Sequence, residues 1–194
     1  IVLLVFSSLT KKEKVLEFIK NNLLDFQELE KIHIFFEDLY VYLLSKNHLL
    51  KELEGYDIAN VRYLTKGHRG MLFKANYKKK KVVIKTKNPE SKAIGRIKNE
   101  SNWLQKINKY KIGPKLLFTK EGYFVYKYID GDFIVDYIKK SNKSKIKKVI
   151  KKIFYQLFKL DELKIDKEEM HHPFKHIIIA KDIPYIIDFE RMHY

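Results

Sequence analysis

The stretch from Tyr56 to Tyr128 constrains the fold of this chain most, because short apolar runs alternate there with clusters of glycine or lysine. The apolar runs lie at residues 61–64, 71–75, 82–84, 115–118 and 123–128. Short runs rich in Val, Ile, Leu and aromatic residues, separated by turn residues, are typical of antiparallel strands joined by hairpins. A helix is predicted over residues 92–110, and Ile112-Gly113-Pro114 follows it as a breaker. The expected order is three strands, one helix and two strands.

The first 55 residues are predicted to form a helical extension before this sheet. Thr10-Lys11-Lys12-Glu13 has the spacing of a capping box, in which a hydroxyl and a carboxylate satisfy the first free amides of a helix. A second helical stretch is expected from about Asp25, since an apolar stripe continues through Phe36, Leu39, Tyr40, Leu43 and Leu44. The opening run Ile1–Phe6 is far shorter than the roughly 20 residues that cross a bilayer, so we expect it to begin a buried strand or helix.

Residues 131–194 are predicted to form a small, mostly helical lobe. A short helical stretch reaches Lys140, and a longer helix follows a loop at residues 141–144. The apolar face of the longer helix is expected to consist of Ile146, Val149, Ile150, Ile153, Phe154, Leu157 and Leu160. Several lysines lie away from that face and are expected to be solvated or to meet an acidic partner: Lys145, Lys147, Lys148, Lys151 and Lys152.

The composition is strongly basic and lacks cysteine. The 194 residues include 40 Lys and Arg against 24 Asp and Glu, which gives a net charge of +16. The absence of cysteine excludes disulfides, thiolate zinc sites and cysteine nucleophiles, and it fits the reducing cytoplasm, where we expect the protein to act. The positive field attracts phosphate-bearing partners such as nucleotides or RNA, although Lys together with abundant Ile is also the usage of AT-rich genomes or heat-adapted proteins.

A glycine turn between the first two strands is a candidate phosphate site. Lys66-Gly67-His68-Arg69-Gly70 contains two glycines, which allow backbone geometries and a close approach that a Cβ atom would forbid. Such a turn can direct amide donors at phosphate oxygens. Glycine at a hairpin is equally often a plain turn, so the two interpretations stay open at this point.

The third strand ends in a cation that needs a partner. Lys85 follows Val82-Val83-Ile84, and the next helix offers Glu100 fifteen residues later. A buried ammonium group requires a carboxylate, and such a pair can hold the lysine toward nucleotide phosphates.

A second candidate follows a predicted hairpin near the end of the chain. Ile177–Ile179 and Tyr185–Ile187 are expected to pair around Lys181-Asp182, and Asp188 comes directly after the second strand. A carboxylate in that position is costly unless it binds something, and hard oxygen ligands suit Mg²⁺. The hairpin should bring Lys175 and His176 near Asp188. Three histidines lie within residues 171–176, but they lack the spacing of known zinc motifs.

The order of these features resembles the protein-kinase superfamily. The sequence has five features in the order found in that superfamily: the glycine turn, the Val-Val-Ile-Lys strand end, the helical glutamate, the strand that enters Tyr128-Ile129-Asp130-Gly131, and the run Ile186-Ile187-Asp188-Phe189-Glu190. The likeness is to the small archaeal Ser/Thr-kinase-like proteins related to the RIO kinases and to the kinase subunit of the KEOPS complex. It covers about residues 56–190.

The resemblance implies a fold and a set of site residues. The fold would be α+β and kinase-like, with a helical extension at 1–55, a five-stranded antiparallel N-lobe with one helix at 56–130, and a minimal helical C-lobe at 131–194. ATP and Mg²⁺ would be the cofactors, with Asp188 as a metal ligand. The phosphates would meet Lys85, paired with Glu100, and the glycine loop, which comprises Lys66, Gly67, His68, Arg69 and Gly70. The adenine would meet a hinge that contains Val125, Tyr126 and Tyr128.

The catalytic loop departs from the family. The His-Arg-Asp sequence followed by Asn is absent, and Glu190 replaces the final Gly of Asp-Phe-Gly. If His176 takes the place of the metal-binding Asn, the base position falls on His171. A register with a two-residue insertion instead places Glu169 there, where a carboxylate can accept the hydroxyl proton.

Two functions of different class follow from these residues. The first is an ATP-dependent phosphotransferase, an atypical Ser/Thr protein kinase that acts on a protein substrate. The second is a nucleotide-binding pseudokinase or scaffold in an RNA-associated complex, which the altered catalytic loop favours. A small-molecule kinase of the aminoglycoside type is a third reading, drawn from Ile187-Asp188-Phe189-Glu190 alone.

Overall fold

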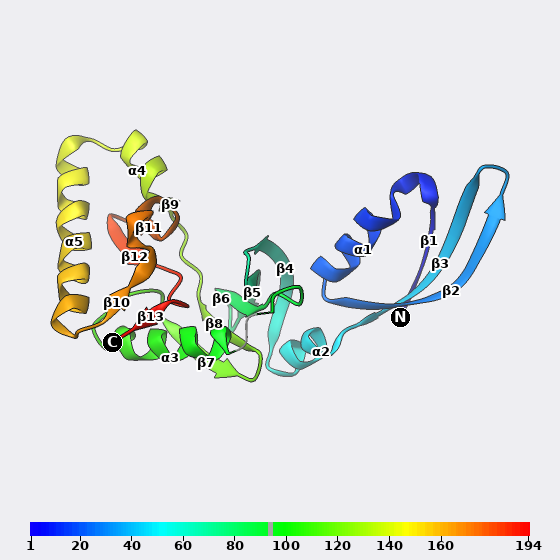
Figure 1. Ribbon diagram of the computed structural model, residues 1–194, viewed down its shortest axis with the longest axis horizontal. Coiled ribbons are helices and arrows are strands. Elements are labelled where there is room, and N and C mark those ends of the chain that lie inside the picture. The colour runs from blue at the N-terminus through cyan, green and yellow to red at the C-terminus, as the bar shows by residue number, and fades with distance from the viewer. Residues whose placement is uncertain (93–94) are drawn as a thin grey trace. The chain divides into compact units, whose positions relative to one another are not determined.

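The computed structural model describes residues 1–92 and 95–194, apart from the side chain of residue 169. It is a mixed α+β chain in which the strands pair antiparallel (Figure 1). The chain divides into two compact units. Unit 1 contains residues 1–64 and 73–81, and unit 2 contains residues 65–72 and 82–194.

The N-terminal part of unit 1 is a small sheet with one helix on it. Its elements are β1 (Val2–Ser7), a 3₁₀ turn (Ser8–Thr10), α1 (Lys12–Asn21), β2 (Leu24–Ile34) and β3 (Glu37–Lys46), and α2 (His48–Gly55) follows. The strand order is β1-β3-β2. Ile19 of α1 packs on Phe6, Tyr40, Tyr42 and Leu44 of the sheet, which gives this part a core of its own.

The prediction of a second helix from Asp25 is wrong, because β2 and β3 form an antiparallel hairpin there. Tyr40, Tyr42 and Leu44 alternate with half-buried neighbours along β3, which is the period of a strand. The same apolar residues also fit helical spacing, so local pattern alone does not separate the two, and the packing of α1 on this face of β3 decides in favour of the strand. The 1–55 region is therefore not a helical extension.

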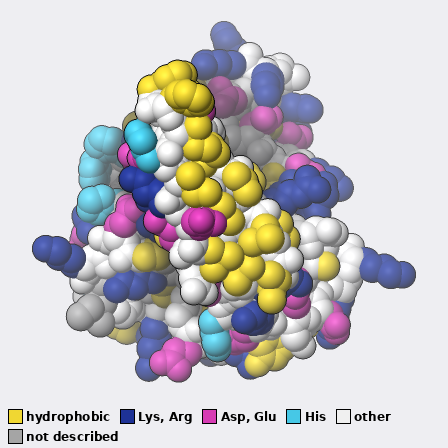
Figure 2. All heavy atoms as spheres, turned by 90° about the vertical axis from the view of Figure 1, so that its right-hand side faces the viewer, with side chains coloured by type: hydrophobic (Ala, Val, Ile, Leu, Met, Phe, Trp, Pro, Cys, Tyr) yellow, Lys and Arg dark blue, Asp and Glu magenta, His cyan; other side chains and the backbone are white. Residues whose placement is uncertain are grey.

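Unit 1 exposes much apolar surface. Figure 2 shows hydrophobic side chains gathered in a band on the side of the molecule that faces the viewer. Exposed hydrophobic residues of this unit include Leu3, Val5, Phe26, Ile32, Phe35 and Phe36. They lie on β1, on β2 and in the turn between β2 and β3.

The expected order of three strands, one helix and two strands is confirmed. The elements are β4 (Ile58–Lys66), β5 (Gly70–Tyr77), β6 (Lys80–Lys87), α3 (Arg96–Asn108), β7 (Leu116–Lys120) and β8 (Tyr123–Lys127). They form a five-stranded sheet in the order β4-β5-β6-β8-β7. In the register of β6 and β8, Lys85 lies opposite Phe124 and Ile84 opposite Val125.

The remainder of unit 2 combines two helices with short strands. These elements are β9 (Asp132–Phe133), α4 (Ile134–Lys140), α5 (Lys143–Glu162), β10 (Asp166–Lys167), 3₁₀ turns at Glu168–His171 and Pro173–Lys175, β11 (Ile177–Ala180), β12 (Ile183–Ile186) and β13 (Met192–His193). The predicted hairpin is confirmed as β11 and β12, with Ile177 opposite Ile186. Lys181 and Asp182 both take positive φ in its turn, as tight hairpin turns require.

Two apolar clusters hold unit 2 together. One joins Trp103, Leu104 and Ile107 of α3 to Phe124, Ile186 and Phe189. The other joins Val149 and Ile153 of α5 to Tyr137 of α4 and to Ile177 and Ile179 of β11. These clusters fix α3 and the segment after β12, which carry the candidate site.

The predicted apolar face of α5 is partly wrong. Val149, Ile153 and Leu160 are buried, but Ile150 and Phe154 are exposed. At 100° per residue, Phe154 lies about 140° around the helix from Val149, so it cannot reach the same cluster. Among the residues that the structure describes, no helix is both long enough and apolar enough to span a lipid bilayer.

Candidate functional site

The centre of the candidate site is the ammonium group of Lys85 on β6. Its Nζ lies 2.6 Å from Glu100 Oε2 on α3 and 3.1 Å from Asp188 Oδ1 after β12. The structure therefore brings together three of the residues selected from the sequence, although 103 positions separate Lys85 from Asp188. All three belong to unit 2.

The three groups set one another's charge. Burial alone would lower the pKa of Lys85, but attraction to Glu100 and Asp188 outweighs burial and raises it far above its ordinary range. Burial, aided by repulsion from Asp188, raises the pKa of Glu100 although Lys85 opposes the shift. Burial would also raise the pKa of Asp188, but the charge and hydrogen bond of Lys85 hold that pKa below its ordinary value. Lys85 is thus a permanent cation at the site.

The backbone of Asp188 is in the left-handed region, with φ of 64°. This conformation costs a non-glycine residue about 1–2 kcal/mol and is found mainly where surrounding contacts impose it. Lys167 Nζ donates a 2.6 Å hydrogen bond to the carbonyl oxygen of Asp188, and Glu100 accepts one from the amide of Phe189. Those contacts hold the backbone from which the Asp188 carboxylate projects.

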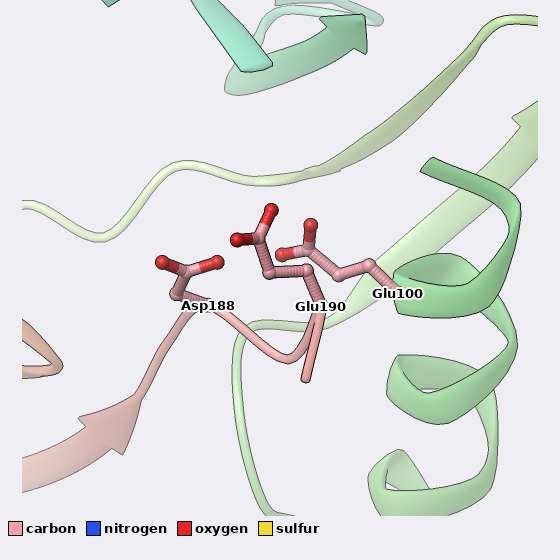
Figure 3. A group of neighbouring side chains, drawn as sticks. All are labelled: Glu100, Asp188 and Glu190. Atoms are coloured by element: carbon pink, nitrogen blue, oxygen red, sulfur yellow. The ribbon is translucent and has the colours of Figure 1, made fainter. Parts of the chain in front are cut away.

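A third carboxylate, that of Glu190, joins Glu100 and Asp188. One oxygen from each lies within 4.8 Å of the others, and Figure 3 shows the three groups converging. Arg69 donates a 2.6 Å hydrogen bond to Glu190, and Asn99 donates to the Glu190 carbonyl oxygen. Carboxylates at this spacing can hold a hard cation such as Mg²⁺.

His176 is the histidine that reaches this group. It is buried, and its Nδ1 lies 3.9 Å from Asp188 Oδ2, as the hairpin predicted. The neighbouring Lys175 was expected there too, but its ammonium group lies over the ring of Phe174, 5.8 Å from the ring centroid.

The glycine turn is ordered by Asn88, a buried residue just after β6. The amide of Gly67 donates a 2.8 Å bond to the carbonyl oxygen of Gly70, and the Asn88 side chain donates to the carbonyl oxygens of Gly67 and His68. A Cβ at Gly70 would lie 3.1 Å from Lys85 Cε and 3.3 Å from the carbonyl oxygen of Thr86. A larger residue at this position would crowd the Lys85 side chain, because Gly70 lies directly against it.

A pocket of about 500 Å³ lies beside the turn. Its lining consists of Lys66, Gly67, His68, Arg69, Asn88, Glu90, Ser91 and Lys92. Lys66 pairs with Glu90 at 2.7 Å across it. The five residues of the predicted phosphate loop thus border a cavity or, for Gly70, pack on Lys85.

The predicted hinge residues lie on and after β8. Val125 is fully buried, and Tyr126 and Tyr128 are half-buried. Burial raises the pKa of the Tyr126 phenol despite the nearby charge of Lys85, so this hydroxyl stays protonated and can donate a hydrogen bond.

His171, one of the two proposed catalytic bases, makes its contacts within its own loop. His171 is exposed, its Nδ1 lies 3.2 Å from the carbonyl oxygen of Glu168, and its ring packs against His172. The side chain of Glu169 lies outside the described part of the chain. The choice between the two registers therefore stays a prediction.

Sequence reasoning missed Lys167, Asn88 and the ionic role of Glu190. Each is a polar residue buried inside the unit, and a buried polar residue is informative only once its burial is known. The signal that could have found Glu190 was its place two residues after Asp188.

No protein-family model matches the sequence, and no curated protein does either.

Proposed function

We propose that this chain binds Mg-ATP and transfers its γ-phosphoryl group, as an atypical Ser/Thr protein kinase with a kinase-like arrangement of lobes. The observation that supports this best is the pair of contacts of Lys85, at 2.6 Å from Glu100 and 3.1 Å from Asp188. Phosphoryl transfer depends on positioning and charge stabilisation more than on covalent chemistry, and both are what this group offers.

Each residue has a distinct part in the proposal. Lys85, held charged by its carboxylates, binds nucleotide phosphates, and Glu100 keeps its ammonium in place. Asp188 and His176 hold Mg²⁺, which neutralises phosphate charge when bound, and Glu190 is close enough to contribute. The turn at residues 67–70 covers the phosphates, and Val125, Tyr126 and Tyr128 border the base. Glu169 or His171 orients the acceptor hydroxyl of a protein substrate.

A second candidate, a nucleotide-binding scaffold with little transfer activity, is favoured by the position of His171. Its ring contacts Glu168 and His172, and neither contact points it at the metal-binding carboxylate. This candidate keeps ATP and Mg²⁺ binding and loses the chemistry.

Titration with Mg-ATP tests the nucleotide site. Lys85→Ala and Asp188→Ala should each weaken binding by about 10- to 100-fold, because each removes a charged contact. Lys87→Ala is the matched control, since this lysine is exposed at the end of the same strand. Melting curves should accompany the titration, because Lys85→Ala leaves Glu100 buried without its cation, whereas Asp188 is partly exposed. Unchanged affinity in both folded variants would exclude the proposed site.

Radiolabelled ATP separates the two candidates. Labelled protein, with the chain alone or with a generic protein acceptor, would identify a kinase. Binding of Mg-ATP without transfer to any acceptor would identify the scaffold.

A further inference from the structure

Helix α5 carries an exposed face that the nucleotide site does not use. Phe154, Tyr155 and Phe158 are 66%, 71% and 60% exposed. The opposite face of α5 packs through Val149 and Ile153 on α4 and β11. Figure 1 shows α5 beside these elements. Three large aromatic side chains exposed within five residues need an explanation, since monomeric proteins rarely leave such groups in water together.

Lysines surround these aromatic side chains. At 100° per residue, Lys147 and Lys151 lie within about 60° of Phe154 and Phe158 around the helix, and Lys148 lies beside Tyr155. Between residues 143 and 160 the helix has seven lysines and no acidic residue. In the described part of the chain, no carboxylate pairs with Lys147, Lys148 or Lys151.

Three other lysines of α5 have partners within the fold. Lys145 lies 3.8 Å from Asp182, Lys152 donates to the Asp182 carbonyl oxygen, and Lys159 pairs with Glu162 at 2.8 Å. Lys147, Lys148 and Lys151, which flank the aromatic rings, therefore differ from these three lysines. An excess of cations at this face attracts a polyanionic partner, and exposed rings one helical turn apart suit flat apolar groups.

We propose that this face of α5 binds single-stranded nucleic acid. Bases stack on Phe154, Tyr155 and Phe158, and the backbone phosphates contact Lys147, Lys148 and Lys151. Phe154 and Phe158 are one helical turn apart, about 6 Å, which an extended single strand can match from base to base. Stacking and phosphate contacts do not read the sugar, so RNA and DNA of one sequence should bind alike.

Fluorescence anisotropy with a labelled single strand of about 12 nucleotides, as oligo-U or oligo-dT, tests this with the full chain in EDTA and without ATP. Phe154→Ala/Phe158→Ala should weaken binding at least about fivefold, because each lost stack removes base affinity. Phe18→Ala is the control, since Phe18 is 63% exposed on another helix, α1. It should bind like the original chain.

The salt dependence tests the lysines. Lys147→Gln/Lys148→Gln/Lys151→Gln should reduce the slope of log K against log salt by about 2, at about 0.7 per phosphate contact. Lys145→Gln/Lys152→Gln/Lys159→Gln makes the same charge change on the same helix and should reduce the slope much less.

Several outcomes would overturn the proposal. Equal binding of duplex and single strand, with no effect of the phenylalanine changes, would mean unspecific charge attraction. Binding to phosphatidylserine vesicles that needs Phe154 and Phe158, without oligonucleotide binding, would identify a membrane surface. A dimer in sedimentation that the same changes dissociate, again without oligonucleotide binding, would identify a second copy of the chain as the partner. ATP binding is measured separately, so its failure would leave this result unaffected.

Discussion

At the scale of single residues, Asp188 shows how the site combines backbone and charge. Three features fix this residue. Its backbone is left-handed, Lys167 donates a hydrogen bond to its carbonyl oxygen, and Lys85 contacts its carboxylate. A residue fixed by so many contacts is ready to bind a ligand without rearrangement, and preorganisation of this kind is what an electrostatic site needs.

The charge of Asp188 should make the stability of the chain depend on pH. Its pKa is held below the ordinary 3.8, so the ionised carboxylate stabilises the fold above pH 3.8, and this contribution disappears as the pH falls through the lower folded value. The difference in unfolding free energy between the original chain and Asp188→Asn should therefore shrink below pH 3.8. Denaturant melts between neutral pH and pH 3 measure it, with the exposed Asp161→Asn as control. A difference that stays constant over that range would contradict the stabilising role of the charge.

Turnover should distinguish the two registers of the catalytic loop. Loss of the group that orients the acceptor hydroxyl should lower the rate by roughly 10²–10⁴ while ATP affinity is kept. Glu169→Gln should be the damaging change if the insertion register is right, and His171→Ala if it is not. His176→Ala should instead weaken the dependence on Mg²⁺, because this side chain lies 3.9 Å from the Asp188 carboxylate. Phosphoryl transfer at the original rate in all three variants would contradict the catalytic roles proposed for these residues.

The sequence could predict residues that end apolar strands, and it could not predict those that meet across the fold. Lys85 and Asp188 each follow a buried run, where a charge is costly without a partner, so each stood out. Lys167 and Arg69 bind Asp188 and Glu190 through contacts that join segments 21 and 121 residues apart. Nothing in local pattern marks such a partner.

At the scale of elements, the turn between α3 and β7 supports the candidate site through its contact with Phe189. Gly113 has φ of +77°, and a Cβ there would lie 2.8 Å from the ring of Phe189, next to Asp188. The turn therefore closes directly on the aromatic ring of Phe189, which anchors the segment after β12 in the core.

Gly113→Ala should destabilise the chain by about 2–4 kcal/mol, because a left-handed alanine is strained and its methyl group meets Phe189. Gly122→Ala is a close control, since Gly122 has φ of +82° but a Cβ there would meet no atom within 4 Å. It should cost only the backbone part, about 1–2 kcal/mol. Denaturant unfolding of both variants measures the two contributions, and equal costs would show that contact with Phe189 contributes nothing.

The type of element was predictable where the apolar runs were short and separated by turns. The prediction failed where one apolar run fitted both the helical and the strand period. The sheet β4–β8 and the hairpin β11–β12 have clear turn residues between strands. Leu39, Tyr40, Leu43 and Leu44 fit a helix by spacing, yet Tyr40, Tyr42 and Leu44 form the buried side of a strand. The packing of α1 on that strand decides between the two, and packing is a tertiary property.

At the scale of the whole molecule, charge and chemistry are concentrated in the same part of the chain. Residues 1–55 have seven lysines and nine acidic residues, whereas residues 56–194 have 33 Lys and Arg against 15 Asp and Glu. The candidate site and the face of α5 both lie in unit 2. The N-terminal sheet has its own core around Tyr42 and contributes none of the described site contacts.

A chain that begins at Tyr56 should therefore keep both binding activities. Deletion of residues 1–55 removes β1 to β3 and α1, which form a separate sheet and core, together with α2, and it leaves every strand of the β4–β8 sheet. The shortened chain should bind Mg-ATP within about threefold of the original, since no charged contact of Lys85 or Asp188 is removed. Oligonucleotide binding should be kept or strengthened, because the deleted part is slightly acidic and the remainder more positive. Calorimetry with Mg-ATP and anisotropy with the single strand measure these, after circular dichroism has established that the shortened chain is folded. A folded chain that has lost ATP binding would mean that the N-terminal sheet takes part in the nucleotide site.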